Sequence, residues 1–361
     1  MSSALAAQSA MAQQSGDRVG TGMIGVGNRG SSLLAGVIDQ PNAKVLAICD
    51  LKADRLDKAA TAAAKDNPTT FTDWKKLLDR KDIDSVFIAT PPHLHSEMAI
   101  AAIQAGKNVY LEKPVGVNAA QVRDLLRVAK NSKKVLHIGQ QLRSQKQLSM
   151  AVQKIHEGAI GEILMVKAQR HASADLDHNG SSADWYFNYA KSGGYLIEQS
   201  VHNLDLCNWV IGNHPLKAAG FGGTQLYKND PPGRDIMDCL SLTYQYPRGV
   251  NLSFTQLVFH PRSMPSGNQY VMVYGSKGAV DLMGGANYYP LNRDEQPSQL
   301  VPKQEEYAHA HIALFYECVQ KGVKSNADIT IGATAALTAI MGSDACLKQQ
   351  MINWSDFGVD V

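Results

Sequence analysis

The glycine motif Gly25-Val26-Gly27-Asn28-Arg29-Gly30 constrains the fold of this chain more than any other feature. It follows the apolar run 19–24, which predicts a buried strand, and it opens the segment 28–38, which predicts a helix. In such a turn the first glycine permits the tight bend, the second lets a pyrophosphate approach the backbone, and the third lets helix and strand pack closely. The motif therefore predicts a dinucleotide-binding turn, with Asn28 and Arg29 beside the phosphates.

Asp50 strengthens this prediction, because it ends the next predicted strand, 44–49, 20 residues after Gly30. A carboxylate there accepts hydrogen bonds from both ribose hydroxyls of adenosine and repels a 2′-phosphate. The pyrophosphate is expected on the N-terminus of the helix, where unpaired N–H groups favour an anion. We therefore predict NAD, in preference to NADP. The alternative interpretation is a glycine turn in a Rossmann-like domain that binds no nucleotide.

The first third of the chain alternates short apolar runs with helical segments. This alternation predicts a doubly wound parallel sheet with right-handed crossovers. Expected strands lie at 19–24, 44–49, 85–89, 108–111 and 135–138, and expected helices at 28–38, 53–65, 72–78, 95–105 and 118–130.

The pattern changes after Gly139. Residues 240–246 and 250–254 alternate apolar with polar side chains across a Pro-Arg-Gly turn, which predicts an antiparallel hairpin with one face buried. Further strands are expected at 163–170, 270–274 and 279–283. We predict an α/β protein with a Rossmann domain at 18–139 and a second α/β domain at 140–361, which has an open, mostly antiparallel sheet and whose final helices pack back on the first domain.

Composition excludes several classes of protein. The 361 residues carry 35 Lys+Arg and 33 Asp+Glu, so the formal charge is only +2 and argues against nucleic acid as a partner. No uninterrupted apolar run approaches the ~20 residues that span a bilayer, so no membrane partner is expected. The five cysteines are widely spaced, which indicates neither a disulfide framework nor a zinc knuckle.

Residues 1–17 are small, polar and rich in Ala, Ser and Gln. Ala10-Met11-Ala12 fits a signal-peptidase site, but no basic segment or long apolar core precedes it. A disordered arm and the remnant of an export signal are both compatible with this segment. The compartment is therefore expected to be cytoplasmic or periplasmic.

Two further motifs carry groups suited to proton transfer. Glu112-Lys113-Pro114 follows the fourth strand, at the edge where doubly wound sheets bind ligands. If 196–210 is one helix, then Glu198, His202 and Asp205 share a face, and the two carboxylates would orient the imidazole and make it basic. For each motif alone, an ordinary solvent-facing ion pair is the competing interpretation.

Taken together, the glycine motif, Asp50, Thr90-Pro91-Pro92-x-x-His95, Glu112-Lys113-Pro114 and the stretch from Gly193 to Asp205 resemble the Gfo/Idh/MocA oxidoreductases, from about Arg18 into the final helices. The resemblance implies NAD(P)-dependent oxidation or reduction of a hydroxyl of a sugar or cyclitol. It also implies a cis bond before Pro114 and a homo-oligomer, a dimer or tetramer, formed through the C-terminal sheet.

The resemblance assigns roles to individual residues. Lys113 takes the place of the catalytic lysine and His202 that of the general acid/base, with Glu198 beside it. The residues expected at the nicotinamide end are Thr90, Pro91, His95 and Glu112, and those expected on the substrate are Arg143, Asp205 and His202. The chain departs from the family at Glu198, Ser200 and Pro92, where Asp, Gly and Asn are common, so no particular relative's substrate transfers to it.

The loop after His171 contains Asp175, Asp177 and His178 and leads to Trp185 and Tyr186. Read as a metal site with Glu198 and His202, its spacing fits no template, so we predict no metal. We interpret it as a substrate loop, in which Trp185 and Tyr186 stack on a sugar. Aromatic plugging of the interdomain cleft is the alternative.

Three functions fit these features. The first is an NAD-dependent dehydrogenase of a sugar or polyol. The second is a glycoside hydrolase that oxidises a ring carbon transiently, with Tyr186 or Asp184 as a second acid/base and a tightly bound NAD that is returned each cycle. The third is an NAD-binding sensor without turnover, against which the presence of both Lys113 and His202 argues.

Overall fold

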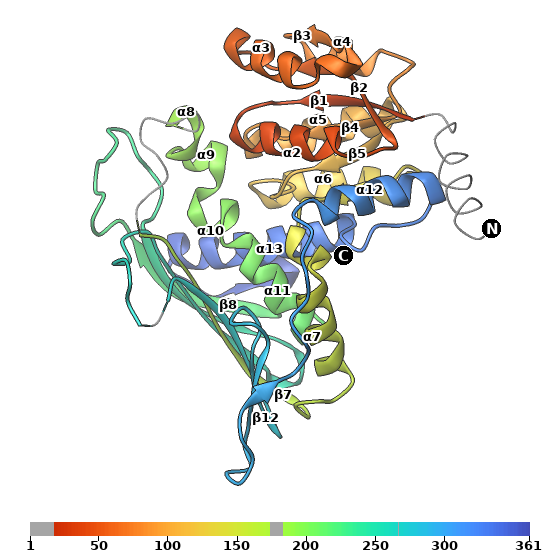
Figure 1. The fold of residues 1–361 in the computed structure, drawn as a ribbon. Coiled ribbons are helices and arrows are strands. Elements are labelled where there is room, and N and C mark those ends of the chain that lie inside the picture. Colours follow the sequence, from red (N-terminus) through yellow and green to blue (C-terminus); the bar gives the residue numbers. More distant parts are fainter. Residues whose placement is uncertain (1–17, 174–182, 266) are drawn as a thin grey trace, which may run out of the picture.

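The computed structural model describes residues 18–173, 183–265 and 267–361. They form two domains, with the first above the second in Figure 1. The prediction of an α/β protein with a parallel and a mostly antiparallel sheet is confirmed.

The first domain contains a six-stranded, wholly parallel sheet in the order β3-β2-β1-β4-β5-β6. The strand order reverses beside β1, so the glycine turn lies at the switch point where such sheets bind ligands. The strands are β1 (Val19–Ile24), β2 (Ala43–Cys49), β3 (Thr69–Phe71), β4 (Ser85–Ile88), β5 (Asn108–Leu111) and β6 (Leu136–Ile138). The helices are α2 (Asn28–Ile38), α3 (Ala53–Ala62), α4 (Trp74–Leu78), α5 (His95–Gln104) and α6 (Ala119–Lys130).

The second domain contains a nine-stranded sheet in the order β14-β13-β12-β11-β7-β10-β9-β8-β15. All neighbouring strands pair antiparallel except β7 and β10, which pair parallel. The strands are β7 (Ile163–His171), β8 (Lys217–Gly223), β9 (Cys239–Gln245), β10 (Asn251–Leu257), β11 (Gln269–Gly275), β12 (Gly278–Asp281), β13 (Asn287–Pro290), β14 (Ser298–Gln299) and β15 (Ile352–Asn353).

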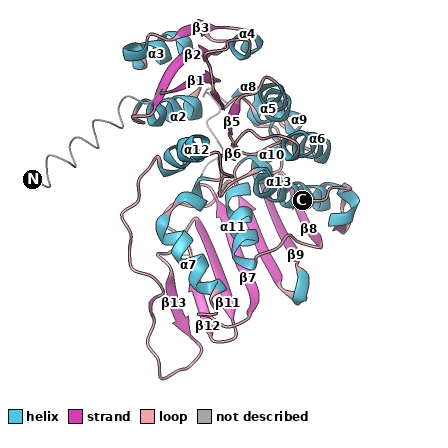
Figure 2. Ribbon diagram, turned by 90° about the vertical axis from the view of Figure 1, so that its right-hand side faces the viewer, coloured by secondary structure: helices cyan, strands magenta, loops and turns pink. Residues whose placement is uncertain are grey.

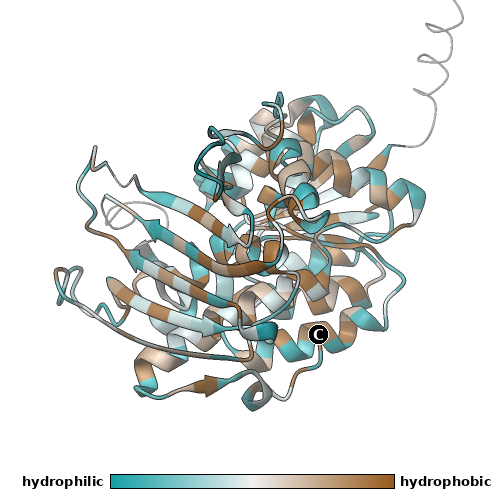
Figure 3. Cartoon of the chain, turned by 90° about the horizontal axis from the view of Figure 1, so that it is seen from below, coloured by the Kyte–Doolittle hydropathy of each residue, from teal (hydrophilic) through white to brown (hydrophobic). Residues whose placement is uncertain are grey.

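Helices cover one face of this sheet (Figure 2). Over this face lie α7 (Lys146–His156), α11 (Val201–Ile211) and α13 (Ile329–Lys348). α10 (Gly194–Glu198) packs on α13, while α8 (Ala183–Tyr186), α9 (Tyr189–Ser192) and α12 (Ala310–Lys321) lie on the side of the first domain. The strands carry alternating hydrophobic and hydrophilic bands (Figure 3), as expected of a sheet with one packed face.

The last two helices connect the domains. α12 packs on α2, and α13 lies between α6 of the first domain and α11 and β8 of the second. Among the described residues, α13 is the one helix long and apolar enough to cross a bilayer, yet 78% of its most apolar window is buried inside the fold. Its apolar surface therefore packs within the protein and joins the two domains.

Candidate functional site

A cleft of about 840 Å³ lies between the two domains. From the first domain it is lined by Gly25, Gly27, Asn28, Arg29, Asp50, Thr90, Pro91, His95, Glu112 and Lys113, and from the second by Trp185, Glu198, Gln199 and His202, among others. A volume of this size suits a ligand larger than a single sugar ring.

The glycine turn offers an open backbone surface at Gly27. A Cβ atom at Gly27 would meet only the guanidinium of Arg55, 3.2 Å away, whereas one at Gly30 would lie 2.0 Å from the Gly25 carbonyl oxygen. Gly30 is therefore needed for packing, and Gly27 leaves room for a group that approaches from the cleft. The buried Asp50 accepts from the N–H of Val26 at 2.9 Å and of Lys52 at 3.0 Å, which fixes its carboxylate beside the turn. These features fit the pyrophosphate and adenosine ribose of a dinucleotide.

His95 forms part of the cleft wall. Its two ring nitrogens lie 2.6 Å from the Pro114 carbonyl oxygen and 2.8 Å from that of Thr90. The side chain is buried, and burial lowers the pKa of His95. His95 thus ties the loop after β4 to the Lys113–Pro114 bond, which is cis.

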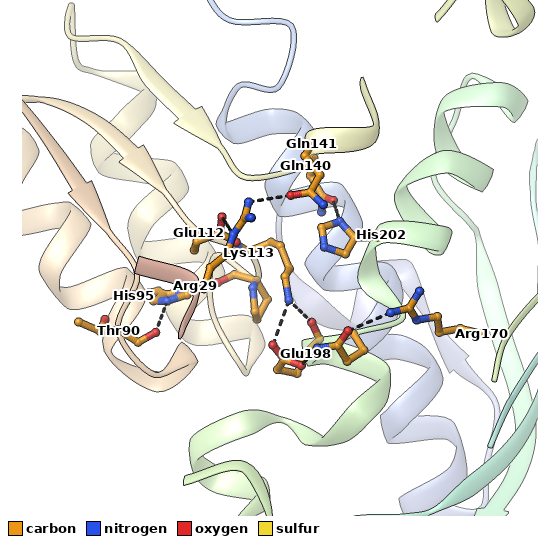
Figure 4. A network of polar contacts seen from close by, with 12 residues as sticks. Arg29, Thr90, His95, Glu112, Lys113, Gln140, Gln141, Arg170, Glu198 and His202 are labelled. Carbon is orange, nitrogen blue, oxygen red and sulfur yellow. Dashed lines mark hydrogen bonds and ion pairs between the residues drawn. The ribbon is translucent and has the colours of Figure 1, made fainter. Parts of the chain in front are cut away.

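Lys113 reaches across the cleft to the second domain. Its Nζ donates to the backbone oxygen of Glu198 at 2.5 Å and to Glu198 Oε1 at 3.0 Å (Figure 4). The two side chains are about nine-tenths buried, at 10% and 11% exposure. The neighbouring Glu112 pairs with Arg29 Nε at 2.7 Å, and Arg29 Nη2 donates to Gln141 Oε1 at 2.6 Å.

His202 lies in the first turn of α11 and points toward Lys113 (Figure 4). Its Nδ1 is 3.1 Å from Gln140 Oε1, so a proton on Nδ1 leaves Nε2 free to accept one. Burial, followed by the positive charges of Lys113, Arg170 and Arg29, holds the pKa of His202 well below its usual value. The imidazole is therefore neutral near neutral pH.

The expectation of one helix over 196–210 is wrong. α10 ends at Glu198 and α11 starts at Val201, with Gln199 and Ser200 between them. As a result Glu198 turns to Lys113 and not to His202. Asp205 also points elsewhere, because both of its oxygens bind Arg143, at 2.8 and 2.9 Å. His202 is not flanked by carboxylates.

Several residues expected at the substrate lie outside the cleft lining. Asp205 is buried in its pair with Arg143, whose guanidinium lies 4.9 Å from the ring centroid of Trp209. Tyr186 is fully buried against Phe187 and Tyr195, away from the cleft, while its neighbour Trp185 does line the cleft.

The loop proposed to contact substrate falls partly outside the described residues, since Asp175, Asp177 and His178 belong to the segment 174–182. Within the described ranges, no group of three His, Cys, Asp or Glu side chains is placed to bind a metal.

Three side chains near His202 and Lys113 were not predicted as site residues: Gln140, Gln199 and Arg170. Gln140 and Gln141 come just after β6, as Glu112 and Lys113 come just after β5. Because ligands bind at the carboxyl ends of parallel strands, this position could have indicated the two glutamines. Gln199 and Arg170 carry no comparable sequence signal.

The fold and the cleft define a two-domain oxidoreductase with a dinucleotide-binding Rossmann domain. Profile comparison shows the same: residues 19–140 match "Oxidoreductase family, NAD-binding Rossmann fold", and residues 149–281 match "GFO/IDH/MocA C-terminal domain". The chain belongs to the Gfo/Idh/MocA family.

The relatives cover from about three quarters to nearly all of this chain. An inositol 2-dehydrogenase of Rhizobium meliloti is 28% identical over 91% of this chain and 95% of its own length. A 2,7-anhydro-N-acetylneuraminate hydratase of Mediterraneibacter gnavus is 25% identical over 73% and 67%. Among solved structures, levoglucosan dehydrogenase in complex with NADH and L-sorbose superposes with a TM-score of 0.81 over 95% of this chain and 100% of that one, at 20% identity.

Proposed function

We propose that this chain is an NAD-dependent dehydrogenase that oxidises one hydroxyl carbon of a sugar or cyclitol. The observation that carries the proposal is the convergence of Lys113, from the first domain, and His202, from the second, on one cleft that starts at the dinucleotide-binding turn. Relatives named inositol 2-dehydrogenase and levoglucosan dehydrogenase support this substrate class.

The residues divide the work as follows. The neutral His202 takes the hydroxyl proton on Nε2, while its Nδ1–H stays on Gln140. The ammonium of Lys113 donates a hydrogen bond to the substrate oxygen and stabilises the negative charge that develops there. A bound NAD would supply the hydride acceptor for this carbon. Because Glu198 holds Lys113 from the other side, the lysine needs little reorganisation when substrate arrives.

A panel of sugars and cyclitols with NAD, followed by NADH absorbance, tests the proposal. We expect turnover with at least one of them, and a loss of about 10²–10⁴ in kcat for Lys113→Met and for His202→Ala with NAD affinity kept. Near-normal rates in both variants would contradict the catalytic roles proposed for Lys113 and His202.

We also propose that NAD is preferred over NADP, because the Asp50 carboxylate is fixed by two backbone N–H groups where a 2′-phosphate would bring more negative charge. Asp50→Ser should bring the dissociation constant for NADP closer to that for NAD. An unchanged ratio would show that Asp50 does not select the cofactor.

A second candidate, redox-neutral glycoside cleavage with tightly bound NAD, is supported by a relative named glycosyl hydrolase family 109 protein, 31% identical over 41% of this chain. The buried Tyr186 is poorly placed as its second acid, whereas Asp184 lines the cleft and pairs with Lys52 at 3.3 Å. Release of an aryl aglycone with catalytic NAD and without net NADH would favour this candidate over the first.

We further propose a homo-oligomer formed through the face of the large sheet that helices leave uncovered. Phe221, Tyr274 and Tyr289 lie on this face and are 82%, 38% and 42% exposed. Light scattering after size exclusion should give a mass above 39.1 kDa, and Phe221→Asp with Tyr274→Asp should lower it. A monomeric wild type contradicts this proposal.

A further inference from the structure

A chain of hydrogen bonds links strand β7 to Lys113 through two residues that the mechanism above leaves unused (Figure 4). Arg170 Nη2 donates to Gln199 Oε1 over 3.1 Å. Gln199 Nε2 donates to Glu198 Oε2 over 2.5 Å, and Glu198 Oε1 accepts from Lys113 Nζ over 3.0 Å. The chain crosses from the floor of the second domain to the catalytic edge of the first.

The direction of these bonds is fixed by chemistry at both ends. A guanidinium can only donate and an ionised carboxylate can only accept, so one orientation of the Gln199 amide satisfies both neighbours. Gln199 lies in the break between α10 and α11 (φ −106°, ψ −49°). Its side chain therefore takes its orientation from Arg170 and passes it on to Glu198.

Both oxygens of Glu198 are used, one by Lys113 and one by Gln199. A buried ion pair is favourable only when the remaining lone pairs are also hydrogen-bonded, and the second oxygen of Glu198 depends on Gln199 for this. Without that bond the carboxylate could rotate, and the Lys113 ammonium would be held only by its bond to the backbone oxygen of Glu198, which leaves its position less well defined.

We propose that Arg170 is a positioning residue that acts through Gln199 to fix Glu198, and with it the Lys113 ammonium, at the place where the substrate oxygen binds. This inference rests on the proposed function and extends it to two residues of the second domain.

Arg170 has a second effect that Gln199 lacks. The charged and titratable groups that face His202 are Lys113 after β5, Arg29 on α2, Arg170 on β7 and His311 on α12, each of which lowers its pKa. Removal of the Arg170 charge should raise the pKa of His202. A change at Gln199 breaks the relay and leaves these charges in place.

The test compares Arg170→Met and Gln199→Met in the NAD-loaded enzyme, with Arg123→Met on the exposed surface of α6 as control. Both site variants should lower kcat about 10²-fold, since a displacement of ~1 Å at a reacting group costs that much. The KM for NAD should stay unchanged. Arg170→Met alone should shift the acidic limb of the pH–rate profile upward. Arg123→Met should match the wild type.

Labelling of Lys113 by acetic anhydride, read by peptide mass spectrometry, reports on the relay without turnover. We expect about tenfold faster labelling in both site variants, because a charge-assisted hydrogen bond to the amine is weakened. If Arg170→Met does not fold, the labelling rate and kcat of Gln199→Met test the relay instead. Unchanged labelling and kcat within twofold overturn the relay while the dehydrogenase stands. A wild type that oxidises no substrate overturns the proposed function, and labelling still decides the relay.

Discussion

His202, the proposed base, lies in surroundings that are poor in negative charge. Its hydrogen-bond partner is the amide of Gln140, and three cations lie around it. A low pKa keeps the imidazole neutral over the physiological range, so the acidic limb of the pH–rate profile should lie below pH 6.5. The proton it takes must leave readily, since the imidazolium is unfavourable there.

Gln140→Glu tests this description. A carboxylate 3.1 Å from Nδ1 stabilises the imidazolium, so the pKa of His202 should rise and the acidic limb should move up by about one pH unit or more. The exposed Gln153→Glu on α7 adds the same charge away from the site and should leave the profile alone. A limb that stays in place in Gln140→Glu would remove His202 as the titrating base.

Arg143 is predicted to contribute to stability. It is bound through two hydrogen bonds to Asp205, which is 2% exposed, and burial raises the pKa of Asp205 despite the nearby guanidinium. Arg143→Met leaves that acid unpaired, so the free energy of unfolding should fall by ~3–5 kcal/mol.

Urea unfolding measures this loss. Arg127→Met removes an exposed partner of Asp124, 3.7 Å away, and should cost no more than ~0.5 kcal/mol. If both variants lower the free energy of unfolding equally little, Arg143 does not stabilise the fold and would instead serve ligand binding.

At the level of elements, two glycines of the turn between β1 and α2 have different expected roles: Gly30 allows close packing, and Gly27 leaves room for the cofactor. Gly30→Ala places Cβ 2.0 Å from a backbone oxygen, so it should destabilise the domain markedly. Gly27 has φ −67°, and its Cβ would meet only the Arg55 side chain, so Gly27→Ala should fold. It should nevertheless weaken NAD binding at least tenfold.

Thermal unfolding and NAD titration of both variants check this. Tight NAD binding by Gly27→Ala would contradict a pyrophosphate seated over this turn. Wild-type stability of Gly30→Ala would contradict the close approach of α2 to β1.

Local sequence signals predicted the helices of the first domain and most of the longer strands, but they missed the strands β3, β8, β13, β14 and β15 and the break between α10 and α11. Apolar runs that end at Gly25 and Asp50 identify β1 and β2, and the polar Asn118 starts α6, where it accepts from the N–H of Gln121. No Gly or Pro marks the break between α10 and α11. Tertiary hydrogen bonds from Lys113 and Arg170 hold the residues there, and such bonds leave no local sequence signal. Helical periodicity alone therefore could not predict that Glu198 pairs with Lys113 and Asp205 with Arg143.

At the level of the whole molecule, buried neutral histidines connect the domains. His137 on β6 stacks on Tyr110 with 5.0 Å between ring centroids and bonds Ser325, 2.7 Å away, just before α13. Burial and then the nearby His311 lower the pKa of His137 to about 3. His311, on α12, bonds Tyr110 and has a pKa lowered to about 4, chiefly by burial.

These histidines make the fold sensitive to acid. Each folded-state pKa lies below the unfolded value, so their contribution is complete above about pH 6.5 and is lost as the pH falls, when the unfolded chain takes up protons. At pH 5, His137 alone should cost about 2 kcal/mol relative to pH 7.

His137→Phe should reduce this loss between pH 7 and pH 5, measured by urea unfolding at both values. Phe315→Leu, in the same aromatic cluster, should lower stability equally at both. A pH dependence unchanged in His137→Phe would show that its protonation does not drive acid unfolding.

The central claim is that a dinucleotide on the first sheet presents its reactive ring to Lys113 and His202, which come from different domains. A crystal structure of the complex with NADH tests it most directly. We predict the pyrophosphate over the Gly25–Gly30 turn, with nicotinamide C4 within about 5 Å of both Lys113 Nζ and His202 Nε2. A pyrophosphate bound elsewhere, or a ring turned away from either side chain, would contradict the claim.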